Sequence, residues 1–163
     1  MPRVFVSVGS NIDRARNIRS ALDTMAAQFG ELVISEIYES EAVGFEGQNF
    51  YNLVVAFDTD LGLDELVARL HDIEYAHGRA RSNRKFAPRT LDLDLLIYGG
   101  LVDHATPHDV PRHEITEYAF VLRPLSEIAG DEVHPESGQT YAQMWQAFSD
   151  RGQRLWRVVR RPD

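Results

Sequence analysis

The sequence contains no cysteine. This absence excludes a disulfide framework and thiolate catalysis, and a zinc site would have to rely on histidine and carboxylate ligands. Long apolar runs are also absent, because the run that begins at Met1 is too short for a signal peptide and no later segment reaches the length of a membrane span. The composition therefore predicts a soluble cytoplasmic protein that does not enter a membrane.

Positive charge is scarce as well. The formal net charge is −8, so the protein as a whole does not attract nucleic acid electrostatically. Any anionic ligand must be attracted by a local cluster of basic residues. At 163 residues, without a linker or an internal repeat, the chain is expected to form one domain over residues 1–163 and to act as a monomer. One stretch, residues 79–89, concentrates basic side chains: Arg79, Arg81, Arg84, Lys85 and Arg89.

The spacing of apolar residues predicts the order of the first elements. Residues 3–9 have the pattern of a buried strand, residues 14–29 that of a helix closed by Gly30, and residues 32–38 and 50–59 that of two further strands. A second helix is expected between Gly62 and Gly78, and a strand over residues 91–98. This order is typical of the α+β class with a ferredoxin-like βαββαβ core, an antiparallel sheet with helices packed on one side.

Beyond Gly100 the patterns are weaker. They favour a short strand near residues 101–102, helices near 117–129 and 141–148, and a last strand at 155–159. Histidines 104, 108 and 113 lie in a proline-containing loop, and we expect them to be solvated loop residues rather than zinc ligands.

The segment from Leu91 to Tyr98 carries two carboxylates in a leucine-rich strand. Because side chains alternate along a strand, Asp92 and Asp94 should share one face, and residues two apart lie roughly 6–7 Å from each other. Such a pair can hold one divalent ion or two close ions, and the basic stretch upstream suits a polyphosphate. The alternative is a solvated edge strand balanced by a solvated arginine loop.

The run from Lys85 to Leu96 resembles the signature of the 6-hydroxymethyl-7,8-dihydropterin pyrophosphokinases. These enzymes of folate biosynthesis transfer pyrophosphate from MgATP to a pterin hydroxymethyl group and release AMP. Further matches follow in the family's order over most of residues 3–130: Gly9-Ser10-Asn11, Tyr38, Val43-Gly44, Phe50, Asn52, Glu74, Gly78-Arg79, Phe120-Val121-Leu122 and Pro124-Leu125.

The resemblance implies two substrates, ATP and a pterin, and a cofactor, Mg²⁺, with two ions held by Asp92 and Asp94. Its catalytic residues would be these two aspartates together with Arg81 and Arg89, which grip the phosphates. Asp94 is also a candidate acceptor for the proton of the attacking hydroxyl. The positions implied for ATP binding are His71, Glu74, Arg81, Lys85, Arg89, Leu95 and Arg112.

For the pterin, the resemblance implies a slot between two aromatic rings. Phe50 and Phe120 match the stacking positions, Asn52 the amide that reads the ring edge, and Ser40 and Val43 contribute backbone hydrogen bonds. Taken singly, each phenylalanine is more often a core residue than a ligand contact, and Asn52 can be an ordinary polar residue of an edge strand. Glu74 can equally form a surface ion pair with a nearby arginine.

Several positions depart from the family's pattern. Arg112, or His113 if the loop shifts, replaces a nucleotide-contacting histidine, and spacing favours Arg112. Three alternatives therefore stay open: a paralogue acting on a related pterin, a magnesium-dependent nucleotidyltransferase, and a non-catalytic ligand-binding module on the same fold. The other departures are Glu41 and Ala42 in the pterin loop, Phe86 at a tryptophan position, and Pro107 and Tyr118 at cationic positions.

Overall fold

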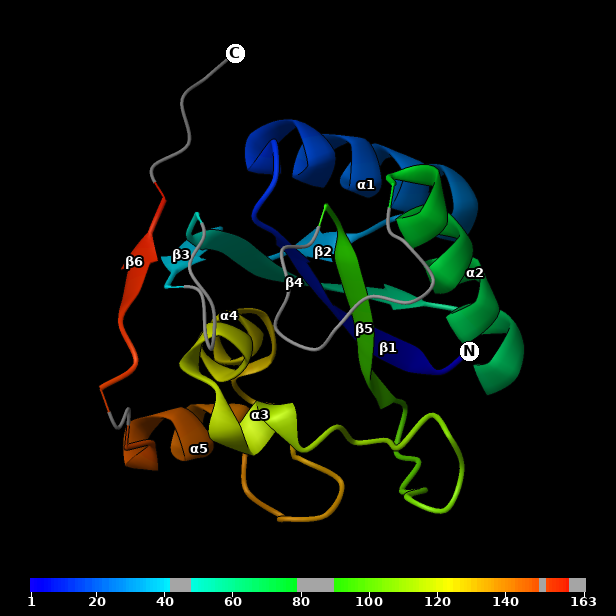
Figure 1. Cartoon of the computed structure of the whole chain (residues 1–163). Helices are drawn as coiled ribbons and strands as arrows, with labels where there is room; N and C mark the ends of the chain where they lie inside the picture. Colours follow the sequence, from blue (N-terminus) through cyan, green and yellow to red (C-terminus); the bar gives the residue numbers. More distant parts are fainter. Residues whose placement is uncertain (42–47, 79–89, 150–151, 159–163) are drawn as a thin grey trace.

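The computed structural model describes residues 1–41, 48–78, 90–149 and 152–158 (Figure 1). Its strands are β1 (Arg3–Ser10), β2 (Val33–Ile34), β3 (Tyr38–Ser40), β4 (Phe50–Asp58), β5 (Asp92–Tyr98) and β6 (Leu155–Arg157). Its helices are α1 (Arg14–Phe29), α2 (Leu63–Ala76), α3 (Glu114–Glu117), α4 (Ala119–Ala129) and α5 (Tyr141–Ala147). No described helix combines the length and the apolar character that crossing a membrane requires.

The strands form a single antiparallel sheet in the order β5-β1-β4-β3-β6, and β2 also pairs with β4. With β2 and β3 taken as two pieces of one strand, the first four strands have the order expected for the ferredoxin-like βαββαβ core. The prediction of an α+β fold with an antiparallel sheet is confirmed. The last strand, β6, extends the sheet beyond β3.

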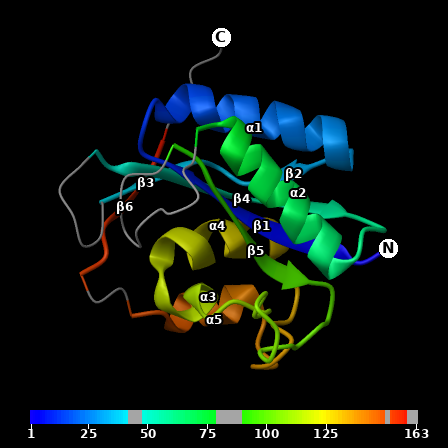
Figure 2. The same cartoon turned by 45° about the vertical axis from the view of Figure 1, so that its right-hand side comes forward.

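Helices cover both faces of this sheet (Figures 1 and 2). On one face, apolar residues of α1 and α2 such as Ile18, Met25 and Leu70 pack against alternate residues of β1, β4 and β5. On the other face, α3, α4 and α5 pack against the remaining residues, with Leu122 and Tyr141 fully buried. The sequence predicted α1 and α2 on one side but did not place the C-terminal helices, which cover the opposite face.

The predicted strand over residues 32–38 is split, and Ser35 explains why. Its N–H donates to the Val54 carbonyl at 3.0 Å, and its hydroxyl accepts the N–H of Val54 at 2.9 Å. Between Ile34 and Tyr38 the chain advances four residues while β4 advances three, from Val55 to Asn52. This is a bulge, in which a serine side chain replaces one ladder contact.

Two predictions beyond Gly100 differ from the structure. Leu101 and Val102 are exposed loop residues instead of a strand, and the pairing nearby is an isolated bridge between Asp103 and Val110. The predicted helix over 117–129 begins at Ala119, because Tyr118 is extended with φ −118° and ψ 125°. The helix at 141–148 is confirmed as α5, and the last strand is confirmed over its described part as β6.

Candidate active site

Asp92 and Asp94 occupy the face of β5 that points away from α1 and α2. Their neighbours Leu93 and Leu95 are buried in the core formed with those two helices, whereas both aspartates are only partly buried. Alternation along a strand then directs both carboxylates to the opposite face. The sequence predicted this shared direction, and the burial pattern agrees with it.

Cross-strand pairing aligns these carboxylates with the other candidate residues. Gly9 of β1 pairs with Asp92 on one side and with Asn52 of β4 on the other, and Asn52 in turn pairs with Tyr38 of β3. Neighbouring strands lie about 4.8 Å apart, so two strand spacings place Asp92 and Asn52 roughly 10 Å from each other. Asp92 of the predicted metal pair and Asn52 of the predicted pterin set thus lie in one row across one sheet face.

Asn52 is buried and held by Ser40. Its Nδ2 donates to Ser40 Oγ at 2.7 Å, and both residues are at most 5% exposed. A Cβ added at Gly9 would lie 3.0 Å from Asn52 Oδ1 and 3.9 Å from Phe50 Cδ1. A side chain at position 9 would therefore crowd the amide of Asn52, which would have to shift by a few tenths of an ångström.

Phe120 lies in the first turn of α4, a helix that packs on the same face of the sheet. Helix α4 contacts both β4 and β3, the strands of Phe50 and Ser40. The ring of Phe120 stacks on Tyr118 with centroids 5.0 Å apart and planes 19° apart, and both rings are partly buried. Burial and the nearby charges of Glu117 and Glu114 raise the pKa of Tyr118. The structure brings Phe50, Asn52 and Phe120 to the same side of the sheet.

Arg112 is attached to the end of β5. Its backbone N–H donates to the Leu96 carbonyl at 2.9 Å, and its guanidinium Nε and Nη2 each lie 2.7 Å from Glu114 Oε2. Burial lowers the pKa of Arg112, but the charges of Asp94 and Glu114 outweigh burial and raise it above its ordinary value. Between the two residues left open by the sequence, Arg112 is the one whose pKa the charge of Asp94 raises, and the side chain of His113 is 61% exposed.

On the other face, α2 supports β5 through Glu74. Glu74 is 1% exposed, and its Oε2 accepts the N–H of Leu93 at 2.7 Å. It therefore lies behind the strand segment that carries the two aspartates, and the alternative of a surface ion pair does not apply. His71, one turn earlier, is exposed, and its ring lies 6.5 Å from that of Tyr75. Leu95 has its side chain in the core, which leaves only its backbone for ATP.

Comparison with known proteins identifies the family. The family model described as 7,8-dihydro-6-hydroxymethylpterin-pyrophosphokinase (HPPK) matches residues 5–130. The chain belongs to this family. It is thus an ATP-dependent pyrophosphokinase of folate biosynthesis, as its resemblance predicted.

The relatives of this HPPK chain include proteins of similar and of much greater length. The 2-amino-4-hydroxy-6-hydroxymethyldihydropteridine pyrophosphokinase of Pseudomonas aeruginosa is 38% identical over 133 residues, which cover 79% of this chain and 82% of that protein. The enzyme of the same name from Aquifex aeolicus is 34% identical, with 83% and 85% covered. The folic acid synthesis protein fol1 of Pneumocystis carinii is 35% identical over 90% of this chain, but the chain spans only 20% of that protein.

A solved structure supports the fold. The crystal structure of wild-type Plasmodium falciparum HPPK-DHPS with SDX-DHP superposes with a TM-score of 0.67 at 12% identity, covering 90% of this chain and 43% of that chain. At that identity the likeness shows the fold alone.

Some predicted HPPK site residues lie outside the described part of the chain. The structure places Ser40, Phe50, Asn52, His71, Glu74, Asp92, Asp94, Leu95, Arg112 and Phe120. The residues outside it are Val43 of the pterin set and Arg81, Lys85 and Arg89 of the phosphate set, so their roles stay predictions. From the glycines and the basic residues that they contain, we also expect segments 44–48 and 81–87 to close over the bound substrates, and both lie mostly outside the described residues.

Two residues of this HPPK site were missed from the sequence. Gly9 was noted only as part of a weak motif, and the structure gives it a reason through its contact with Asn52. Glu114 was not singled out, although it holds Arg112. The sequence contains a pattern that could have indicated each residue, namely a glycine at the end of a buried strand and an acidic residue two positions after an arginine. Neither pattern identifies a functional residue without knowledge of the tertiary contacts.

The loop histidines are engaged with carboxylates. His104 lies between Asp109 and Glu136, His108 Nε2 is 2.7 Å from Asp64, and His113 Nδ1 is 2.9 Å from Glu114. The described residues contain no group of three or more histidine and acidic side chains arranged to hold a metal. The pair Asp92 and Asp94 is smaller than such a group and needs ligands from elsewhere.

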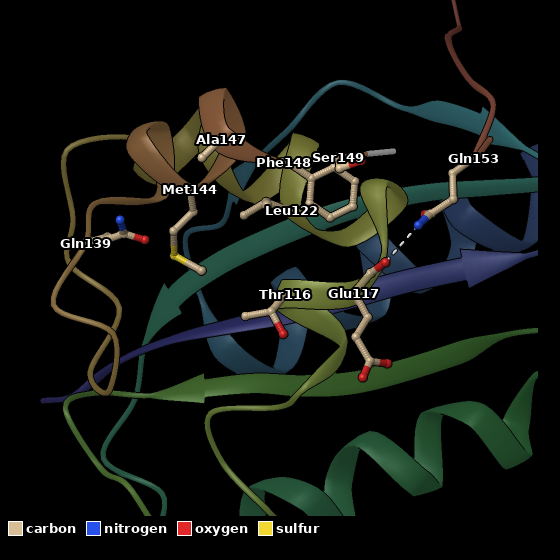
Figure 3. Close-up of a pocket in the computed structure, with 9 residues that line it drawn as sticks. All are labelled: Thr116, Glu117, Leu122, Gln139, Met144, Ala147, Phe148, Ser149 and Gln153. Atoms are coloured by element: carbon tan, nitrogen blue, oxygen red, sulfur yellow. Dashed lines mark hydrogen bonds between the residues drawn. The ribbon is translucent and has the colours of Figure 1, made fainter. Parts of the chain in front are cut away.

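A pocket of about 690 Å³ has a lining that includes no residue of the row Asp92, Gly9 and Asn52 (Figure 3). It is lined by parts of α3, α4 and α5 together with Gln153, and none of the predicted site residues contributes to it. Gln153 bridges the break between α3 and α4, because it accepts the N–H of Ala119 and donates to the carbonyl of Glu117, both at 2.8 Å. This pocket is separate from the proposed reaction site.

Proposed function

We propose that this HPPK chain transfers pyrophosphate from MgATP to the hydroxymethyl group of 6-hydroxymethyl-7,8-dihydropterin, with Asp92 and Asp94 binding the metal and Asn52 reading the pterin. The observation that carries this assignment is the row Asp92, Gly9 and Asn52 across three paired strands. The row spans roughly 10 Å, which suits a pterin ring at one end and its hydroxymethyl group near the phosphates at the other.

The residues at the proposed metal site fit magnesium. Asp92 and Asp94 are partly exposed carboxylates on one face of a strand, and carboxylate oxygen is the ligand that Mg²⁺ prefers. Two carboxylates do not fill an octahedral shell, so water and phosphate oxygens must complete it, as is usual for magnesium at nucleotide sites. We propose that two ions bind here and neutralise charge on the transferred group.

The protein's part in the reaction is mainly positioning. The hydroxymethyl oxygen attacks the β-phosphorus, the bond from that phosphorus to the oxygen bridging to the α-phosphorus breaks, and AMP leaves with that oxygen. Phe50 and Phe120 orient the ring, Asn52 fixes its edge, and Asp94 is our candidate for accepting the hydroxyl proton. We further expect Arg81 and Arg89 to bind the phosphates of ATP. We expect the protein to be monomeric and cytoplasmic, and to bind neither nucleic acid nor a membrane.

The test is a pterin-dependent assay of AMP release across a small set of pterins. The wild-type chain should release AMP with 6-hydroxymethyl-7,8-dihydropterin, and the variant Asp92→Asn plus Asp94→Asn should lose roughly 10²–10³-fold or more in kcat. Asp60→Asn serves as the control, because Asp60 is exposed in the loop before α2.

Each competing function has its own outcome in this assay, and a non-catalytic ligand-binding module would release no AMP with any pterin. Release of pyrophosphate instead of AMP would indicate a nucleotidyltransferase, and preference for another pterin would indicate a specialised paralogue. Magnesium-dependent consumption of ATP that survives loss of both aspartates would show that the catalytic assignment is wrong.

A further inference from the structure

Arg112 and Glu114 form a largely desolvated ion pair at the metal end of the site. Both guanidinium nitrogens that face Glu114 contact the same carboxylate oxygen, Oε2, at 2.7 Å. The side chains are only 31% and 17% exposed. Removing two charges from water to this extent is costly, so the pair has to be offset by other interactions or retained for function.

The environment of Glu114 is incomplete. Its second oxygen, Oε1, is buried and makes no hydrogen bond of good geometry within the described residues, although His113 Nδ1 lies 2.9 Å away. Polar atoms in this state are uncommon in folded proteins and ask for an explanation. A contribution to folding stability is therefore a poor explanation for the presence of a glutamate at position 114.

Asp94 gives Arg112 a second possible partner. The backbone of Arg112 is bonded to Leu96, two residues beyond Asp94 on the same strand, and the charge of Asp94 acts on the guanidinium. A guanidinium binds a carboxylate through two parallel hydrogen bonds and would compete there with a divalent ion. The contacts in the structure connect Arg112 with Glu114.

We propose that Glu114 is a positioning residue that holds the Arg112 guanidinium and thereby keeps Asp94 available to the metal. The inference rests on the proposed role of Asp92 and Asp94 as magnesium ligands. It predicts that removal of the Glu114 charge releases Arg112 onto Asp94, so metal binding weakens only while Arg112 is present.

The experiment titrates Mn²⁺ alone, without nucleotide, and follows paramagnetic broadening of the backbone amide signals of residues 92–94 by NMR. Four proteins are compared: wild type, Glu114→Gln, Arg112→Ala and the double variant. Glu114→Gln should need about tenfold more Mn²⁺ for half broadening, which corresponds to about 1.4 kcal/mol. The double variant should bind within about twofold of Arg112→Ala. Glu117→Gln, an exposed change in the same short helix, is the control.

The double variant separates this role from two simpler ones. If Glu114 acts only by its charge on the metal, Glu114→Gln weakens binding by the same factor with and without Arg112, and the inference is wrong. If Glu114 only stabilises the fold, its loss lowers Tm and Arg112→Ala does not restore metal binding, which also overturns it.

Two further results keep the inference testable. Absence of broadening at residues 92–94 in the wild type, with Mn²⁺ alone and again with a non-hydrolysable ATP analogue that supplies phosphate oxygens, would refute the metal site itself, and with it the role of Glu114. If Glu114→Gln does not fold, Arg112→Ala decides alone: the inference requires it to bind Mn²⁺ at least as tightly as the wild type, and weaker binding refutes it.

Discussion

Gly9→Ala tests whether the crowding over strand β1 serves pterin recognition. The added methyl carbon would lie 3.0 Å from Asn52 Oδ1, so the amide must withdraw by a few tenths of an ångström. The same amide donates to Ser40 Oγ at 2.7 Å and has almost no free space, because Asn52 is 4% exposed. The substitution therefore acts on the side chain that we expect to read the pterin edge.

The magnitude follows from two opposing terms. Weakening one buried hydrogen bond costs about 1 kcal/mol of folding free energy, and replacing glycine by alanine at an extended position returns roughly 0.4–1 kcal/mol through the unfolded state. The free energy of unfolding should consequently change by less than about 1 kcal/mol. A misplaced amide should cost about 1–2 kcal/mol of pterin binding, a factor of roughly 5–30 in Kd.

Titration calorimetry with the pterin and with a non-hydrolysable MgATP analogue measures both halves of the site. Pterin Kd should rise in Gly9→Ala while nucleotide Kd stays within about twofold of the wild type. Gly100→Ala is the matched control, because a Cβ there meets no atom within 4 Å. Pterin binding equal to that of Gly100→Ala, in a protein of unchanged Tm, would refute the role given to Asn52.

Two further predictions concern stability. Glu74→Ala removes the acceptor of the buried Leu93 N–H; at about 2 kcal/mol for a hydrogen bond to a charged group, Tm should fall by roughly 4–8 °C in a thermal melt. Glu65→Ala, an exposed change in the same helix, should melt close to the wild type, and equal melting of the two variants would contradict the support given to β5. Hydrogen bonds to Asp109 and then to Glu136 raise the pKa of His104 above its ordinary 6.5, so the fold favours the protonated ring. That contribution to stability is complete below pH 6.5 and is lost as pH rises through the folded-state pKa of His104. The Tm difference between wild type and His104→Asn should therefore shrink as pH rises. A Tm difference that does not change between pH 5 and 9 would refute this role of His104.

The part of the fold that could be predicted from the sequence is the part set by local patterns. Helix α1 has the predicted bounds, because its apolar residues recur at helical spacing and Gly30, at φ 88°, ends it. The alternation of Asp92 and Asp94 with leucines likewise determined which face each residue occupies. Both features depend on side chains close to one another in the sequence.

The misses depend on contacts between distant segments. The break at Tyr118 is stabilised by Gln153, 34 residues beyond Ala119, and the bulge at Ser35 by Val54. The burial of Glu74 depends on β5 lying against α2, so its spacing on the helix could not distinguish a surface ion pair from a buried support. Arg112 and Glu114 are near neighbours in the sequence, yet the role that we propose for them depends on Asp94, which lies on another element.

The motif Gly9-Ser10-Asn11, weak when taken alone, acquires a specific meaning from these distant contacts. Ser10 Oγ donates to the Thr90 carbonyl at 2.6 Å, and Asn11 Nδ2 donates to the Gln48 carbonyl at 3.2 Å. Thr90 and Gln48 directly follow the segments that hold Arg89 and Val43, predicted to bind the phosphates and the pterin. The end of β1 thus holds the two residues that follow these segments, while Gly9 leaves room for the amide of Asn52. Small, hydrogen-bonding residues are needed here because three chain segments converge on one strand end.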